Sequence, residues 1–448
     1  MVRKVSVWLL VLSLFISINA AVLFGAGVRY VLMGGGKLGD FGEILLTIAD
    51  FPLKTAQALI ALSKTAPSLI ENRFPEIDGF KKNNNLQADV LKDKGYLLLS
   101  AFGKEENQST VKLIRIRDQE VLHQWTPDFK ELAKTQKSTT QGDKDQITHP
   151  FLLNDGGLIF QNGPLFKINA CSKVEWQIGE FFHHSIEKDP DGNFWIPGVI
   201  EPSSYDARIF IKYKDDALVK VSPDGKILLK RSVSKILEEN GYRGLLFGTG
   251  AYDVDPIHLN DIQPAYSSTP YWKKGDLLLS IRNRSTVFIY RPSTNKVIWL
   301  KTGPWLAQHD PDFIGKSKIS VFGNNVIDYP SKSLSQFRYE YSELVDGYNN
   351  IYFYDFTDNS ISTPYEDILK KLDVRTPTEG RSELLENGDL FIEETDYGRL
   401  LRLSPKKSVW EFVVKVNEET VGRSSWSRYL NEKQLKDILP VLAKSHCS

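Results

Sequence analysis

Cysteine is scarce in this chain of 448 residues, which contains only Cys171 and Cys447. Two cysteines allow a single intramolecular disulfide, and nothing in the sequence around either one indicates a thiol nucleophile. A disulfide would tie the C-terminal tail to the second of the repeated units described below, and an oxidising compartment would permit it. Two unrelated free thiols fit the sequence equally well, so the pairing stays open at this point.

Net charge is also absent, because the 56 basic residues equal the 56 acidic residues in number. No global field therefore favours nucleic acid or an anionic membrane surface, and local charges must hold any anionic substrate. The length allows one large domain or two ordinary ones, and a hydrophobic content of 41% is that of a folded protein.

Long apolar runs are missing except at the N-terminus. The basic stretch Met1–Lys4 precedes an almost uncharged apolar run from Val5 to about Val28, as long as a bilayer-spanning helix of roughly 20 residues. We expect an uncleaved signal anchor at residues 1–33 with its basic end in the cytoplasm. Cleavage as a signal peptide, after the small residues Asn19–Ala21, is the close alternative. In both cases the bulk of the chain is exported. It would be membrane-anchored and face the periplasm or the extracellular side, or be secreted after cleavage.

A helical connector is predicted for residues 34–92. Apolar residues recur at helical spacing between Phe41 and Ile70, and Pro52 and Pro67 are expected to break the helix. The domain that carries the chemistry would then occupy residues 93–448.

Six similar units of short β-rich runs and turns fill this third part. Asp-Gly and Asn-Gly pairs such as Asp191-Gly192 and Asn387-Gly388 supply the positive φ angles that tight hairpins require. Six such units predict an all-β fold, a six-bladed β-propeller. A pair of β-sandwiches is the alternative architecture, which the repetition disfavours. Packing between neighbouring blades is expected for four tryptophans near unit ends, namely Trp125, Trp176, Trp299 and Trp410.

Five of the seven histidines stand at the start of successive units, namely His149, His183, His184, His258 and His309. A residue type that recurs at one point of a radial repeat is brought to one place in space, and the innermost strand of each blade lines the central channel. The sequence therefore predicts a ring of imidazoles around the propeller axis. Alternation along a strand lets only one of His183 and His184 face the channel, and we favour His184.

Four further polar residues are expected at the same end of the channel: Asn260, Arg282, Glu379 and Arg381. Asn260 lies two residues after His258 and on a strand would share its face. Arg282 follows a strand-like run of the fourth unit, and Glu379 and Arg381 stand at the corresponding point of the sixth. An ion pair between Glu379 and Arg381 explains their presence as well as a role in the site does.

Imidazoles, a guanidinium and an amide together suit a tetrahedral oxyanion. Arginine offers a planar fork of donors, and histidine can donate a hydrogen bond or act as a nucleophile. Zinc or manganese is the main competing ligand, since converging neutral imidazoles bind such metals. Arg282 argues against a cation, and we expect no metal. A structural role is the expectation for His123 and His446. It is also favoured for His149, which has the repeat position but lacks the flanking motif.

Several strings in this region resemble the signature of the bacterial, PAPS-independent arylsulfotransferases. The first set comprises His258-Leu259-Asn260-Asp261-Ile262, Gly275-Asp276-Leu277-Leu278-Leu279-Ser280-Ile281-Arg282, Val297-Ile298-Trp299 and Gln308-His309-Asp310. Upstream, His183-His184-Ser185-Ile186 is similar to the family's first active-site histidine segment, and Glu379-Gly380-Arg381 is similar to part of its closing blade. The resemblance covers roughly residues 145 to 415. The family's β-rich N-terminal domain and closely spaced cysteine pair are missing, and the insertion from Asp328 to Asn349 has no counterpart in it.

The resemblance implies transfer of a sulfuryl group by ping-pong through a covalent sulfohistidine, without PAPS or another cofactor. His309 would be the nucleophile that accepts the group from a phenolic sulfate ester, and an acceptor hydroxyl would then remove it. His184, His258 and Arg282 would bind the sulfuryl oxygens, and Asn260 would orient His258. Further substrate contacts would come from His183, Glu379 and Arg381.

Two other functions stay open. A membrane-tethered propeller without activity would bind an anionic or sulfated ligand, and a metal-dependent hydrolase or lyase would use the same histidines. The presence of both His309 and Arg282 favours the transferase, because a degenerate relative should lose them first. The expected partners are a small-molecule aryl sulfate donor, a hydroxyl acceptor and the membrane through the N-terminal segment, but no nucleic acid. The sequence does not indicate an oligomeric state.

Overall fold

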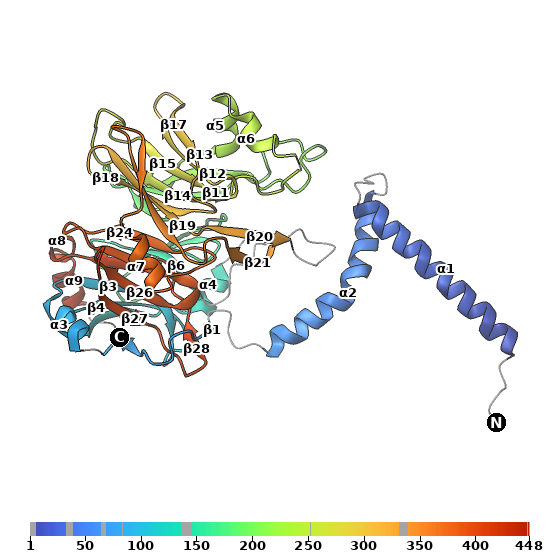
Figure 1. The fold of residues 1–448 in the computed structure, drawn as a ribbon, viewed down its shortest axis with the longest axis horizontal. Helices are drawn as coiled ribbons and strands as arrows, with labels where there is room; N and C mark the ends of the chain where they lie inside the picture. The colour runs from blue at the N-terminus through green and yellow to red at the C-terminus, as the bar shows by residue number, and fades with distance from the viewer. Residues whose placement is uncertain are drawn as a thin grey trace. The chain divides into compact units, whose positions relative to one another are not determined.

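The computed structural model describes residues 6–32, 39–63, 69–82, 84–135, 146–250, 252–330, 339–445 and 447. The chain forms two compact units (Figure 1). One comprises Met1–Ala66 with Asp328–Glu343, and the other comprises Pro67–Ile327 with Leu344–Ser448. His446 and Pro67, for which the sequence suggested roles, lie outside the described residues.

Two long helices dominate the first unit, α1 (Val7–Leu32) and α2 (Gly39–Ser63). α1 is long and apolar enough to cross a membrane, and its apolar stretch is not buried. The expected N-terminal apolar helix is therefore confirmed, and a signal sequence shares these properties. The expected break at Pro52 was wrong, because α2 continues through it. A proline removes one main-chain hydrogen bond, and here the flanking turns remain helical.

The second unit is a six-bladed β-propeller, as the sequence predicted (Figure 1). Each blade is an antiparallel sheet of four strands. From the innermost strand outwards, blade 1 is β29 (Arg428–Leu430), β3 (Tyr96–Gly103), β4 (Gln108–Arg115) and β5 (Glu120–Trp125); blade 2 is β6 (Thr148–Leu152), β7 (Leu158–Gln161), β8 (Leu165–Ile168) and β9 (Val174–Ile178); blade 3 is β10 (Glu187–Lys188), β11 (Phe194–Val199), β12 (Asp216–Val221) and β13 (Ile227–Ser232). Blade 4 is β14 (Leu259–Pro264), β15 (Leu277–Ile281), β16 (Thr286–Arg291) and β17 (Lys296–Thr302); blade 5 is β18 (His309–Ile314), β19 (Lys318–Gly323), β22 (Asn350–Asp355) and β23 (Ser360–Ser362); blade 6 is β24 (Arg381–Leu384), β25 (Leu390–Glu394), β26 (Arg399–Leu403) and β27 (Ser408–Val413).

Short elements surround the blades. The helices are α3 (Asn84–Lys92), α4 (Phe129–Thr135), α5 (Val233–Glu239), α6 (Arg243–Phe247), α7 (Glu366–Lys371), α8 (Glu432–Leu435) and α9 (Leu439–Lys444), with single turns η2 (Arg282–Arg284) and η3 (Thr395–Tyr397). The insertion of blade 5 forms β20 (Val326–Pro330) and β21 (Tyr339–Leu344). Gly192 and Gly388 have φ of 89° and 81°, as expected for their hairpin turns.

Strands from distant parts of the sequence close the ring. β29, near the C-terminus, is the innermost strand of blade 1 and pairs with β3, with Arg428 opposite Leu98. β2 (Gly79–Phe80) extends blade 6 beyond β27, and β1 (Leu69–Glu71) pairs with β28 (Thr420–Gly422). The segment before residue 93 thus contributes two strands to the propeller's unit.

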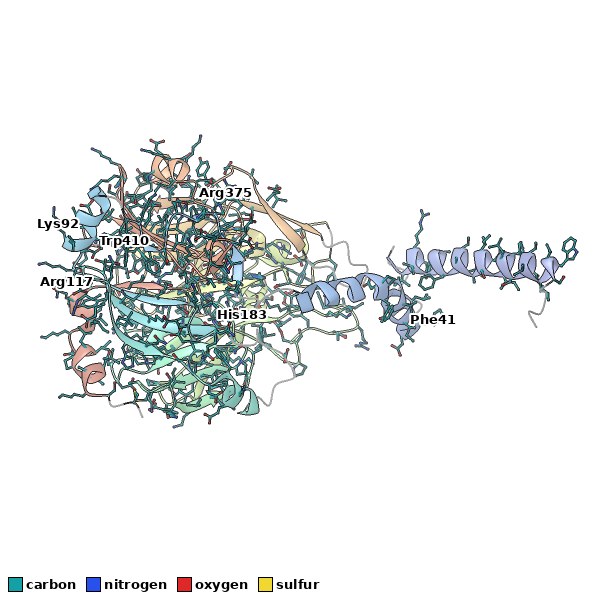
Figure 2. The ribbon with its side chains drawn as sticks, turned by 90° about the horizontal axis from the view of Figure 1, so that it is seen from below. Phe41, Lys92, Arg117, His183, Arg375 and Trp410 are labelled. Atoms are coloured by element: carbon teal, nitrogen blue, oxygen red, sulfur yellow. A yellow bond between two sulfur atoms is a disulfide. The ribbon has the colours of Figure 1, made fainter. Side chains whose placement is uncertain are left out.

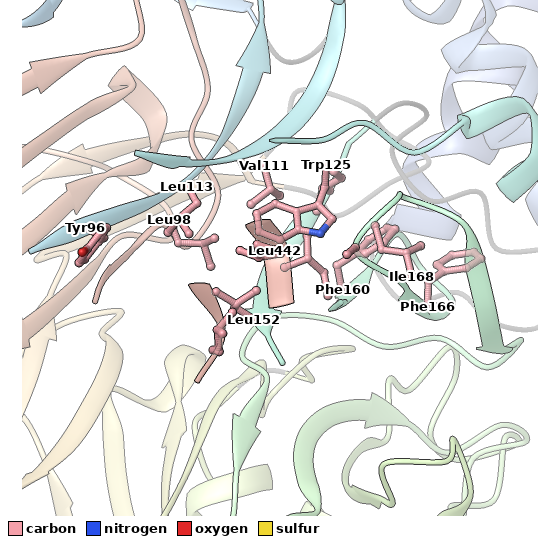
Figure 3. Close-up of a cluster of buried hydrophobic side chains, with 14 of the residues drawn as sticks. Tyr96, Leu98, Val111, Leu113, Trp125, Leu152, Phe160, Phe166, Ile168 and Leu442 are labelled. Atoms are coloured by element: carbon pink, nitrogen blue, oxygen red, sulfur yellow. The ribbon is translucent and has the colours of Figure 1, made fainter. Parts of the chain in front are cut away.

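Hydrophobic clusters fill the spaces between neighbouring blades. Figure 3 shows Trp125 of blade 1 with Phe160 and Phe166 of blade 2 and Leu442 of α9. Trp410 (Figure 2) is fully buried in the cluster that joins blade 6 to blade 1. The indole Nε1 of Trp176 donates to the carbonyl of Pro223 in blade 3, and the ring of Trp299 lies 5.0 Å from that of Tyr354 in blade 5. The predicted packing role of the four tryptophans is confirmed.

The two cysteines form a disulfide. Cys171, in the turn between β8 and β9, is bonded to Cys447 at the end of the chain. The bond holds the segment that follows α9 against blade 2, next to the cluster that contains Leu442. Of the two interpretations that the sequence left open, the paired state is the one observed.

Replacing Cys171 by serine is expected to lower the free energy of unfolding by about 2–4 kcal/mol, since the bond closes a very long loop in the unfolded chain. Denaturant unfolding of the full-length protein measures the difference. Reductant should bring the wild type to the level of the variant and leave the variant unchanged. A wild-type curve that reductant does not move would contradict this expectation.

Candidate functional site

The backbone bends in the same way at the start of each innermost strand. Every blade has a residue other than glycine with a left-handed φ there, namely His149 (49°), His184 (61°), His258 (46°), Ala307 (48°), Glu379 (51°) and Trp426 (59°). Blade 5 has a second such residue, Asp310 (45°), within β18. Residues other than glycine rarely adopt this conformation, and such positions concentrate at functional sites. Three of the six are histidines, so the repeated bend directs several imidazoles to one end of the channel.

His184 lies at the centre of five imidazoles, which we call the histidine cluster. Its ring centroid is 5.0 Å from that of His183, 5.2 Å from that of His258, and 5.9 Å from those of both His149 and His309. The repeat therefore brings the predicted histidines together. His184 contacts all the other rings, whereas His183 (Figure 2) packs towards Phe181.

A buried amide holds His309. The Nδ1 atom of His309 lies 2.7 Å from Oδ1 of Asn324, and the Nδ2 atom of Asn324 donates to the carbonyls of Thr376 (3.0 Å) and Glu379 (2.8 Å). Because these two carbonyls fix which amide atom is nitrogen, Oδ1 must accept a hydrogen bond from His309 Nδ1. The Nε2 atom of His309 therefore carries the lone pair when the ring is neutral.

His309 is neutral over a wide pH range. Its side chain is buried, and burial, followed by the charge of Arg282, lowers the pKa of His309 to about 3. Arg282 itself is 6% exposed, and its main-chain N–H donates to the carbonyl of His258 at 3.1 Å. A buried guanidinium next to an unprotonated imidazole can attract an anion without protonating that imidazole.

Asp255 orients His258. The Nδ1 atom of His258 lies 2.8 Å from Oδ2 of Asp255, and its main-chain N–H donates to Oδ1 at 3.1 Å. Lys214 Nζ lies 3.3 Å from Asp255 and 3.3 Å from Asp216. Burial would raise the pKa of Asp255, but Lys214 and then His258 hold it below its usual value. Asp255 is thus ionised and can pair with His258 when that ring takes up a proton.

Asn260 does not orient His258, contrary to the expectation. Its Nδ2 atom donates to the carbonyl of Gln308 at 2.7 Å, and its Oδ1 atom has no hydrogen-bond partner among the described residues. The expectation assumed regular alternation along one strand. His258 has a left-handed φ and precedes β14, and the pairing register shifts between Leu259 and Asp261, so positions 258 and 260 do not share a face.

His183 and His184 must hold complementary tautomers. Their Nδ1 atoms are 2.8 Å apart, so one donates and the other accepts. The Nε2 atom of His183 lies 3.3 Å from Oδ1 of Asp216, on the side away from His184. Burial, followed by the charge of Lys214, lowers the pKa of His183, and burial lowers that of His184 well below its usual value. Both rings are neutral near pH 7.

Glu379 pairs with Arg423 rather than with Arg381, as far as the described residues show. Its Oε1 atom lies 3.2 Å from Nη2 of Arg423. Glu379 contributes to the histidine cluster through its main-chain carbonyl, which accepts the hydrogen bond from Asn324. The pairing interpretation offered by the sequence was therefore wrong.

Arg381 lies in a layer of buried acidic groups. Its Nε atom is 3.8 Å from Oδ2 of Asp310, and its Nη2 atom is 3.4 Å from Glu383. Burial raises the pKa of Asp310 to about 6 in spite of Arg381, and raises that of Asp312 well above its usual value. The positive charge of Arg381 thus stabilises the ionised forms of buried carboxyl groups, one of which, Asp310, directly follows His309 in the sequence.

The sequence prediction gave no role in the site to four residues that contact the histidine cluster, namely His149, Gln161, Asp255 and Asn324. His149 had the repeat position, and that signal placed it correctly in space even though its flanking residues suggested a structural role. Gln161 ends β7, and Asn324 directly follows β19, the equivalent strand of blade 5. Comparing strand ends between units would have found these two amides. Asp255 lies in an irregular loop and leaves no periodic signal.

No group of three or more His, Cys, Asp or Glu side chains with the arrangement of metal ligands occurs in the described part of the chain.

Comparison with known proteins agrees with the motif strings. Residues 149–415 match the family model described as arylsulfotransferase (ASST). Solved structures with similarity include a protein of unknown function from Bacteroides caccae (14% identity, 75% of this chain, 99% of that chain, TM-score 0.43), hydrazine synthase from Kuenenia stuttgartiensis (12%, 67%, 72%, 0.37) and TolB from Acinetobacter baumannii (10%, 75%, 66%, 0.41). No curated protein matches the sequence.

Proposed function

This chain belongs to the arylsulfotransferase family, and we propose that it transfers a sulfuryl group from a phenolic sulfate ester to an acceptor hydroxyl through a covalent intermediate on His309. The hydrogen bond from His309 Nδ1 to Asn324 carries this proposal. It leaves a lone pair on Nε2 of a buried, neutral imidazole, and an activated nucleophile needs such a lone pair. The surrounding imidazoles and Arg282 can hold an anion against it.

In the first half-reaction the Nε2 lone pair of His309 forms a bond to sulfur while the bond from sulfur to the phenolic oxygen breaks. The electron pair of that bond leaves with the phenolic oxygen, which takes a proton from His258. Arg282 donates to the peripheral sulfuryl oxygens, and preorganised donors of this kind stabilise the charge that develops in the transition state. His184 donates to them in the tautomer that has its proton on Nε2, in which Nδ1 of His183 is the donor of the His183–His184 pair. Asp255 pairs with His258 while that ring carries its proton.

In the second half-reaction the oxygen of the acceptor hydroxyl attacks the sulfur of the sulfohistidine. Its proton passes to His258, and the electrons of the nitrogen–sulfur bond return to Nε2 of His309. The enzyme is then in its starting state, so donor and acceptor follow each other in ping-pong order. The cycle needs neither PAPS nor a metal ion.

We also propose that α1 is an uncleaved anchor that keeps the propeller on the exported side of a membrane. The length and apolar character of α1 support this, and the disulfide Cys171–Cys447 is typical of an oxidising compartment. N-terminal sequencing of the protein isolated from membranes should find the residues before Val7. A new N-terminus after Ala21 would establish cleavage instead.

Intact-protein mass spectrometry tests the reaction. The full-length protein in detergent is exposed briefly to 4-nitrophenyl sulfate without an acceptor, and released nitrophenol is measured in parallel. We expect a mass increase of one SO₃ group together with one equivalent of released nitrophenol. Adding a phenol should remove the SO₃ group from the protein and restart nitrophenol release while donor remains. Neither adduct nor nitrophenol would overturn the proposed function.

Replacing Asp255 by asparagine is expected to slow turnover of poor leaving groups far more than that of nitrophenyl sulfate. The amide cannot pair with protonated His258, and proton transfer to the leaving oxygen contributes about 10²–10⁴-fold only where the leaving phenol needs it. Rates measured for a series of aryl sulfates against the pKa of the phenol give the dependence. Equal losses along the series would show that His258 is not the proton donor.

A further inference from the structure

We propose that two buried amides, Asn324 and Gln161, impose opposite tautomers on His309 and His149, and that His149 is a further sulfuryl-binding residue. This inference rests on the proposed function and extends it. Asn324 and Gln161 would be positioning residues, since each acts through a histidine. His149 would touch the sulfuryl group itself.

Gln161 determines the tautomer of His149. Its Nε2 atom donates to the main-chain carbonyl of His184 and lies 3.1 Å from Nδ1 of His149. The carbonyl of His184 requires the NH₂ group of the amide on this side, and an NH₂ group can only donate. Nδ1 of His149 must therefore accept, and its proton sits on Nε2.

The Nε2–H group of His149 is a buried donor with no hydrogen-bond partner among the described residues. The residue is 3% exposed, and its ring lies between those of His184 and Trp426. An unsatisfied buried donor destabilises a protein because the group loses its hydrogen bond to water on folding, so native structures rarely retain one without a use for it. A bound anion would supply the missing acceptor.

The two amides act on opposite neighbours of His184. The centroids of His149 and His309 are each 5.9 Å from that of His184. Both rings therefore border His184, and we infer that a sulfuryl group held against His184 meets a lone pair from His309 and an N–H from His149. The electron-poor sulfur requires the lone pair of His309, and the electron-rich sulfuryl oxygens require the N–H of His149.

His149 keeps its donor near neutral pH. Burial lowers the pKa of His149 well below its usual value, so the ring stays neutral and its single proton stays on Nε2. The amide of Gln161 donates a hydrogen bond to Nδ1 but does not give up its proton, so it cannot protonate that nitrogen. His149 is in this respect the counterpart of His309, which is also neutral but is held with its proton on the other nitrogen.

Two substitutions of His149 distinguish the effect of its N–H donor from the effect of the space that its ring fills. In the full-length protein, His149→Phe fills the space without an N–H, whereas His149→Gln places an amide N–H at a similar distance. We expect His149→Phe to slow adduct formation from nitrophenyl sulfate by about 10²-fold, and His149→Gln to recover most of that loss. Thermal unfolding of both variants shows whether they fold. Wild-type rates in His149→Phe, or equal losses in two folded variants, would overturn the role of His149.

The tautomers are measured without substrate. In protein labelled with ¹⁵N-histidine, the ring-nitrogen shifts distinguish Nδ1–H from Nε2–H, and His309→Ala and His149→Phe assign the signals. We expect Nδ1–H at His309 and Nε2–H at His149. Asn324→Leu should change only the first and Gln161→Leu only the second. The reverse tautomer at either ring would overturn the inference while adduct formation still supported the proposed function. The expected tautomers without any adduct would instead overturn the proposed function, and the sulfuryl-binding role of His149 with it.

Discussion

The full-length protein with His309 replaced by alanine is expected to form no sulfuryl adduct and to lose at least about 10⁴-fold in turnover of an aryl sulfate. The substitution removes the only group in the proposed cycle that bonds to sulfur. His258 also has its lone pair on Nε2 when it is neutral, because its Nδ1 atom binds Asp255, but in the proposed cycle it transfers the proton and does not bond to sulfur. Intact-protein mass spectrometry measures the adduct, and nitrophenol release measures turnover.

His123→Ala is the matched control for this experiment. His123 lies on β5, where its Nε2 atom is 2.7 Å from the carbonyl of Ala170, and it has no place in the proposed cycle. The control should form the adduct at the wild-type rate. An adduct on His309→Ala that maps by peptide analysis to His184 would move the nucleophile to that ring. A lower but measurable turnover without an adduct would favour direct transfer from donor to acceptor.

Much of the fold was predictable because it repeats. The six units consist of short strands and tight turns, several of them with Asp-Gly or Asn-Gly pairs. These are local features, so each unit predicts its own blade without long-range information. Ring closure by β29 was not predictable in the same way, because a three-residue strand near the C-terminus carries no periodic pattern. The pairing of β1 with β28 could not be predicted either, since each strand has only three residues and shows no periodic pattern.

The candidate site was predictable to the extent that it follows the repeat. His184, His258 and His309 occupy equivalent bends or strand starts, so their positions in the units predicted that they meet. The partners that hold them are not periodic. Asp255 lies in a loop, and the expected partner Asn260 turned out to bind Gln308 because the strand is irregular at that point. A residue's neighbours depend on such local deviations, which a strict alternation of side chains cannot anticipate.

Replacing Arg282 by glutamine is expected to lower the rate of adduct formation by about 10²–10³-fold and to move its acid limb to higher pH. The rate falls because the neutral amide stabilises the developing charge on the sulfuryl oxygens less well. The acid limb moves because the charge of Arg282 helps to hold the pKa of His309 at about 3. Without that charge the pKa of His309 rises, and protonation removes the Nε2 lone pair at a higher pH.

The pH profile separates these two effects, since a purely structural loss would lower the rate without shifting the limb. In the wild type, His309 stays deprotonated from neutral pH down to about pH 4, so protonation of His309 should not limit the rate there. In Arg282→Gln we expect the limb at least about one pH unit higher. Arg282→Lys keeps the charge but not the planar fork, and should retain the wild-type limb with a reduced rate. Arg284→Gln, in the same turn but paired with Asp253, is the matched control and should leave the limb in place. If Arg282→Gln showed the wild-type limb, burial alone would account for the low pKa of His309, and the charge of Arg282 would not contribute.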